Sequence, residues 1–200
     1  MPGKRKLATP IFLIVITLMA ILLVLLYSKV LLNEQTSATD RGERLAAQYG
    51  ACQAFAGALQ GGTEALAGAA SAADRLPAMA QLGQLAPLEE SCAEVLTRKA
   101  VNPDSDEDAA KQQLAAELAN IREAALGIGL HEGALSDDEQ AQLAVLQAGG
   151  AELADMLNAY VVPTAGDRYR QMAAGVEWTQ PAGEAAARIA QLAGALGAGK

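Results

Sequence analysis

Near its beginning the chain has an uninterrupted apolar run, and beyond this run apolar residues alternate with polar ones at regular intervals. From Leu7 to Ser28 there is no charged residue, and 22 residues in a helix span about 33 Å, enough to cross the roughly 30 Å hydrocarbon core of a bilayer. A helix is expected because backbone amides in lipid must be hydrogen-bonded within the segment. We therefore predict a cytoplasmic tail at 1–6, a transmembrane anchor at 7–30 and a helical domain at 31–200.

The charges on the two sides of the apolar run predict its orientation. Basic residues occupy 4–6, and basic residues beside a span stay on the cytoplasmic side. The chain beyond residue 33 carries 11 basic and 23 acidic residues, a formal charge of −12. We expect a single-pass protein of the cell membrane with 31–200 outside the cytoplasm. The alternative is a cleaved signal peptide, which would have a shorter apolar region; its best cleavage site, at 36–38, is poor.

Beyond the anchor, apolar residues recur at every third or fourth position, the spacing of helices in a coiled coil or bundle. No strong helix breaker lies between the span and Ala73, so one long helix is expected to continue directly from the membrane. The predicted fold class is all-α: the transmembrane helix, then an extracytoplasmic antiparallel bundle or hairpin of about four to five helices. Later helices are expected from near Pro77 with a kink at Pro87, after the acidic turn at 104–108, from a capping box at Ser136 and Glu139 to the breakers Pro163 and Gly166, around Arg168–Val176, and after Pro181.

Composition argues against several classes of function. With 200 residues and a net charge of −8, the chain lacks the basic surface of a nucleic-acid binder. One His and two distant Cys do not supply the ligands of an ordinary zinc site. The acidic turn at 104–108 has Ala109 and Ala115 where a calcium loop needs Gly and Glu, so we interpret it as a helix start. No catalytic set can be assigned, and we expect neither an enzyme nor a cofactor.

Cys52 and Cys92 are the strongest local clue. They lie at equal distances from residue 72, close to the expected turn between two helices, and both fall on apolar seams. An antiparallel hairpin would place them opposite each other, and a disulfide is chemically permitted outside the cytoplasm. We predict a disulfide, with two separate buried thiols as the alternative. A redox-active pair is not expected because the chain has no C-x-x-C.

A second cluster, predicted to form an interaction or ligand site, lies toward the C-terminus. It contains three of the five aromatic residues beyond the anchor. Arginine combined with aromatic residues is typical of a contact hot spot or of a pocket for an anionic ligand. The alternative is that these side chains fill and cap one end of the bundle. The cluster comprises Tyr160, Arg168, Tyr169, Arg170 and Trp178.

The layout resembles the anchored helical sensor region of bacterial receptors, although it has no second span and no cytoplasmic output module; fold alone does not establish function. The tail at 1–6 is too short to signal inward as a kinase does. Besides the lipid bilayer, we expect as partner another membrane or extracytoplasmic protein, bound by a non-enzymatic interaction or accessory module. The alternatives are a small-ligand sensor that works through a membrane partner, and a spacer that self-associates through its small-residue seams.

Overall fold

The computed structural model describes residues 5–197, and within that range its regular structure is entirely helical. The all-α fold class is therefore confirmed. The helices are α1 (Arg5–Ala67), α2 (Ala72–Leu82), α3 (Ala86–Leu96), α4 (Glu107–Gly127), α5 (Asp137–Asn158), α6 (Asp167–Ala173) and α7 (Thr179–Gly197), with the 3₁₀ turn η1 (Gly83–Leu85) between α2 and α3.

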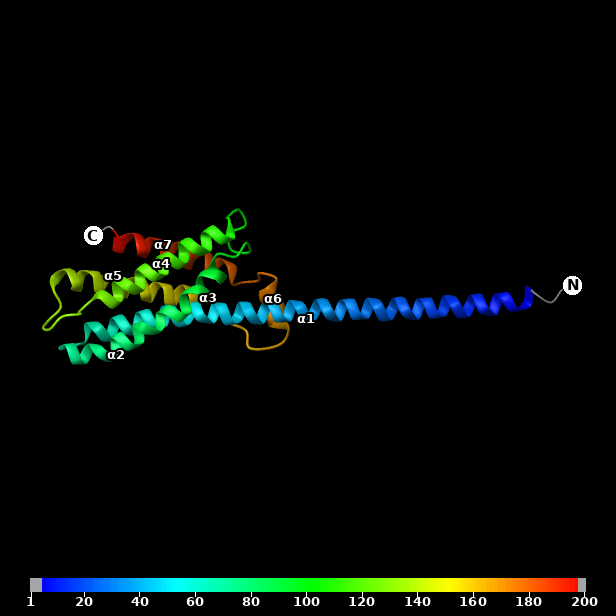
Figure 1. Cartoon of the computed structure of the whole chain (residues 1–200), viewed down its shortest axis with the longest axis horizontal. Coiled ribbons are helices and arrows are strands. Elements are labelled where there is room, and N and C mark those ends of the chain that lie inside the picture. The colour runs from blue at the N-terminus through cyan, green and yellow to red at the C-terminus, as the bar shows by residue number, and fades with distance from the viewer. Residues whose placement is uncertain (1–4, 198–200) are drawn as a thin grey trace.

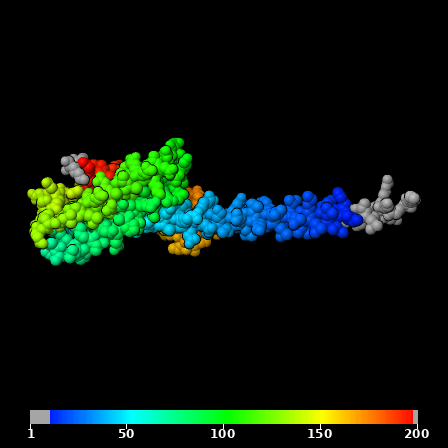
Figure 2. Space-filling model, viewed as in Figure 1, coloured from blue at the N-terminus to red at the C-terminus, as the bar shows by residue number. Residues whose placement is uncertain are grey.

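Helix α1 is one continuous rod of 63 residues, about 95 Å long at 1.5 Å per residue. Figures 1 and 2 show its first half standing clear of a bundle that its second half forms with the other helices. The side chains of 11–37 are exposed on all sides, and this part of α1 is long and apolar enough to cross a membrane. The long helix predicted from the spacing is thus present, and it ends at Ala67.

The second half of α1 is the central helix of the bundle. It packs against α2, α3, α5 and α6, while α7 packs on α4 and α5. The apolar seam predicted from the sequence faces inward, and Leu59 on it is fully buried. A Cβ atom on Gly150 of α5 would lie 3.2 Å from the backbone nitrogen of Gln60, so α1 and α5 approach closely there and a side chain would push against the backbone of α1.

The predicted boundaries differ from the observed ones mainly around α2. Ser71 and Asp74 form a capping box, so α2 begins at Ala72 and Pro77 lies inside the helix instead of at its start. The predicted kink at Pro87 is confirmed, because η1 interrupts the stretch and α3 begins with this proline in its first turn. The stretch is therefore two helices, so the bundle has more helices than the four to five predicted; the short α6 corresponds to the helix expected around Arg168–Val176.

The bundle has two distinct ends. We call the base the end from which the exposed part of α1 projects; it contains 41–49 of α1, the end of α3, and α6. We call the tip the opposite end, formed by the α1–α2 turn at 68–71 and the α4–α5 loop at 128–136. Figure 1 shows this yellow-green loop at the end of the molecule farthest from the N-terminus.

Candidate functional site

Tyr49 on α1 is the centre of an aromatic group at the base. The ring centroids of Tyr160 and Trp178 lie 5.3 Å and 6.3 Å from that of Tyr49, and both pairs meet edge to face. The Tyr49 hydroxyl donates a hydrogen bond of 3.1 Å to the carbonyl of Leu157. Burial, with a smaller contribution from Tyr160, raises the pKa of Tyr49, so its hydroxyl stays protonated. This group therefore ties α1 to the end of α5 and to the segment before α7.

Trp178 has no polar atom left for a ligand. Its side chain is 1% exposed, and its indole Nε1 donates a 2.8 Å hydrogen bond to the carbonyl of Met172. The chain reaches this position through two residues with positive φ, Gly175 at 81° and Glu177 at 69°. The left-handed conformation is uncommon for a residue such as Glu177, which shows how tightly the turn between α6 and α7 is made. Trp178 thus fills the base of the bundle.

The arginines of the predicted cluster lie on the outside of α6. Arg168 is exposed, and Arg170 makes an ion pair of 2.6 Å with Asp167 one turn earlier. Tyr169 is partly buried, and α6 rests directly on α1: a Cβ atom on Gly42 would lie 1.9 Å from the carbonyl oxygen of Tyr169. The structure therefore divides the five predicted residues into buried aromatic rings and outward-facing arginines, and it does not gather them around one pocket.

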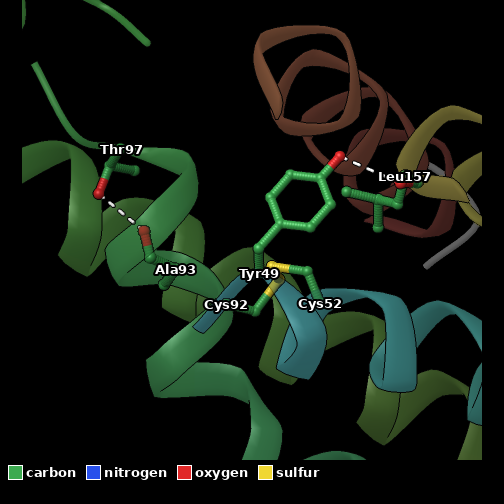
Figure 3. The surroundings of a disulfide bond; sticks show 6 residues. All are labelled: Tyr49, Cys52, Cys92, Ala93, Thr97 and Leu157. Atoms are coloured by element: carbon green, nitrogen blue, oxygen red, sulfur yellow. Dashed lines mark hydrogen bonds between the residues drawn. A yellow bond between two sulfur atoms is a disulfide. The ribbon is translucent and has the colours of Figure 1, made fainter. Parts of the chain in front are cut away.

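Cys52 and Cys92 are joined by a disulfide that links α1 to α3. The sulfur atoms lie 2.17 Å apart, the Cα atoms lie 4.7 Å apart, and both residues are buried. Figure 3 shows the bond in the core beside the ring of Tyr49. The structure thus places the two seam cysteines opposite each other, as a hairpin of the first two helical stretches requires. The bond fixes the central helix to its neighbour on the same side as the aromatic group.

The tip contains a network that the sequence pattern did not reveal. Arg75 of α2 is only 2% exposed, and its guanidinium donates hydrogen bonds to the carbonyls of Gly129 at 3.0 Å, His131 at 2.9 Å and Gly133. Three backbone acceptors around one buried cation hold the loop in a single arrangement. The sequence held one signal for this network: Arg75 lies three positions before Ala78 and therefore falls on the apolar seam of α2. The loop that it binds contains two glycines.

Glu139 holds the other side of the same loop. Its carboxylate accepts hydrogen bonds from the backbone nitrogens of Gly129 at 2.7 Å and Ser136 at 2.8 Å, and from Nε2 of His131 at 2.8 Å. His131 first, and then the two backbone groups, lower the pKa of Glu139 to about 2. The pKa of His131 is raised, first by the carbonyl of Glu132 and then by Glu139. The capping box predicted at Ser136 is confirmed.

This doubly held loop presents apolar side chains to the outside. Leu130 is 76% exposed, and Leu76, in the first turns of α2, is 68% exposed. Between the α1–α2 turn and α5 lies a cleft of about 430 Å³, lined mainly by alanines of the turn and by Leu135 and Leu143. The tip therefore combines ordered backbone with exposed apolar surface, which is the composition expected of an interaction surface.

The His131–Glu139 pair predicts how stability depends on pH. Because the pKa of His131 is raised on folding, its contribution is complete below the ordinary value of 6.5 and is lost as pH rises through the raised value. The contribution of Glu139 is complete above its ordinary value of 4.5 and is lost as pH falls toward about 2. We expect His131→Gln to lower the melting temperature most between pH 4.5 and 6.5, and less at higher pH. Thermal unfolding followed by circular dichroism measures this difference.

The control for this measurement is simple, because His131 is the only histidine of the chain. Any change of stability with the ordinary titration of histidine must therefore come from this residue. A difference between the wild type and His131→Gln that stays constant from pH 5 to pH 9 would contradict a contribution from the protonated pair.

Within the described residues, no group of three or more His, Cys, Asp or Glu side chains is arranged to hold a metal ion. Comparison of the chain with protein-family models, curated proteins and solved structures gives no match. What the protein does must therefore be inferred from the geometry of its own base and tip.

Proposed function

We propose that this chain is a single-pass membrane protein whose bundle lies outside the cytoplasm and serves as a non-enzymatic protein-interaction module. The apolar half of α1, the basic residues at 4–6 and the acidic composition beyond the span support this orientation. The Cys52–Cys92 disulfide agrees with it, because such bonds persist outside the cytoplasm and are rare within it.

The observation that carries the interaction proposal is the fixed loop at the tip. The chain buries the charged side chain of Arg75 to hold a loop whose Leu130 side chain contacts solvent instead of the core. Holding an exposed apolar residue in one arrangement reduces the entropy that would be lost when a partner binds. Since α1 is continuous from the apolar segment into the bundle, the tip is presented at a fixed height above the membrane.

The test is site-specific photocrosslinking of the full chain in its native membrane. A crosslinking residue placed at Glu132, which is exposed next to Leu130, should attach to a distinct protein, and the same residue at exposed Gln112 on α4 should not. The attachment should be lost in the Leu130→Ser variant, because this change removes the apolar contact without touching the carbonyls bound by Arg75. Mass spectrometry then identifies the partner.

Two other outcomes would overturn this proposal. Crosslinks only between copies of this chain would favour the self-associating spacer. An attachment that is as strong from Gln112 as from Glu132, or that survives Leu130→Ser, would show that the tip does not provide the contact.

A further inference from the structure

A cleft at the base collects positive charge on an otherwise acidic bundle. It has a volume of about 350 Å³ and lies between α1, the end of α3 and the turn before α7. Four of the 11 basic residues beyond residue 33 line it, against one acidic residue, Glu107, although this part of the chain carries 23 acids. The four basic residues are Arg41, Arg44, Arg98 and Lys99.

Most of this positive charge is not neutralised by the protein. Arg98 pairs with Glu94 at 2.7 Å and donates to Gln48 at 3.3 Å, and its Nε has no hydrogen-bond partner. Across residues 5–197, Arg41, Arg44 and Lys99 form no ion pair. Three unpaired cations around one cavity favour an anion that carries more than one negative oxygen, and guanidinium groups match phosphate oxygens in geometry.

The remaining wall of the cleft is apolar. Leu45, Ala173 and Trp178 line it together with the basic side chains. A site with a charged side and an apolar side suits a phosphate group attached to a less polar body, because one part satisfies the cations and the other excludes water.

The position along α1 brings this cleft close to the membrane of the proposed function. Arg41 follows the end of the predicted anchor, at residue 30, by eleven residues, or about 17 Å of helix. Headgroups extend roughly 5–7 Å beyond the hydrocarbon core, so the cleft lies about 10–12 Å from them, close to the Debye length. Side chains on a helix also lean toward its N-terminus, which on α1 is the direction of the apolar segment.

We propose that the basic cleft binds a phosphate group, supplied either by the headgroup of an anionic lipid or by a soluble phosphate ester. The lipid source rests on the membrane anchoring of the proposed function, and the soluble source does not. Trp178 is the only tryptophan of the chain and belongs to the buried wall of the cleft, so a change of its fluorescence on titration arises at this end of the bundle.

The experiment uses the full chain in two settings. In detergent without lipid, inorganic phosphate is titrated against chloride at constant ionic strength. In nanodiscs, phosphatidylcholine alone is compared with phosphatidylcholine containing phosphatidylglycerol. A saturable change of Trp178 fluorescence in detergent assigns the site to a soluble anion, and a change only in the phosphatidylglycerol discs assigns it to a lipid headgroup. No change in either setting overturns the proposal.

The matched variants remove the same charge from the same end of the bundle. Arg41→Gln with Arg44→Gln should weaken the response about tenfold or more. Arg168→Gln with Arg170→Gln, on the outside of α6, should leave it within about twofold. Equal losses in the two pairs would show nonspecific attraction and overturn the site.

A third variant tests the cleft if the double variant does not fold, and a separate measurement distinguishes the cleft from the proposed function. If the Arg41 and Arg44 pair fails to fold, Lys99→Gln, at an exposed position just after α3, must weaken the response in its place. The detergent titration does not require membrane anchoring, and the crosslink from Glu132 at the tip does not require the cleft. Failure of the cleft and failure of the proposed function are therefore distinguishable.

Discussion

Replacing Trp178 with alanine is expected to lower the free energy of unfolding by about 3–5 kcal/mol, the range for truncating a large buried aromatic side chain. Trp178 is almost completely buried, meets the ring of Tyr49 edge to face, and donates its indole hydrogen to the carbonyl of Met172. The substitution leaves a cavity at the base and an unsatisfied carbonyl. Urea denaturation of the full chain in detergent, followed by circular dichroism, measures the change.

Arg170→Ala is the matched control within the predicted cluster. Arg170 is partly exposed and pairs with Asp167 on the same short helix, so its removal should change the free energy of unfolding by less than about 0.5 kcal/mol. Similar losses from the two substitutions would contradict the division of the cluster into buried rings and surface arginines. A small loss from Trp178→Ala alone would show that the segment between α6 and α7 packs loosely on Tyr49 of α1.

The helices could be predicted because their signals are local. Spacings of three and four residues place Cys52 and Leu59 on one face, and a face of this kind must be buried wherever the helix packs. Ser136 and Glu139 signal a helix start through hydrogen bonds that close within four residues. Ser71 and Asp74 form the same kind of cap at the start of α2. The prediction instead placed the start of this helix near Pro77, because proline is the more conspicuous helix breaker in the sequence.

The arrangement of the candidate sites depends on contacts between distant segments. Arg75 binds three carbonyls more than 50 residues away, and every residue type has a carbonyl, so no side-chain pattern marks the acceptors. In the sequence, Gly42 is simply a glycine that weakens a helix, and only the structure shows that α6 packs directly on it. The cluster around Trp178 was recognised by composition, but composition does not say which side chains face inward.

The basic cleft could not be predicted either, because it too is formed by segments that lie far apart in the sequence. Its cations come from α1 and from the end of α3, and the sequence separates Arg44 from Arg98 by more than 50 residues of mainly acidic and neutral composition. The net charge of the whole domain is negative, and this average hides a local cluster of basic residues. The disulfide between α1 and α3 joins these two segments covalently, in addition to the packing of the two helices and the Arg98–Gln48 hydrogen bond.

Removing the disulfide, by Cys52→Ala together with Cys92→Ala, is expected to lower the free energy of unfolding by about 4 kcal/mol. The bond closes a loop between residues 40 positions apart, and a crosslink of that span restricts the unfolded chain by about this amount in the chain-entropy treatment. Alanine is chosen because both positions are buried and a serine hydroxyl there would lack a partner. Urea denaturation of the wild type and the double variant measures the loss.

Reduction provides the internal control for this prediction. Adding dithiothreitol to the wild type should destabilise it by a similar amount, whereas the double variant has no other cysteine and should not respond. An unfolding midpoint of the wild type that is the same with and without reductant would contradict the bond. If the bond also holds the cleft in shape, the phosphate response of Trp178 should weaken on reduction under conditions where the helices remain folded, because Arg98 follows the end of the helix that Cys92 anchors.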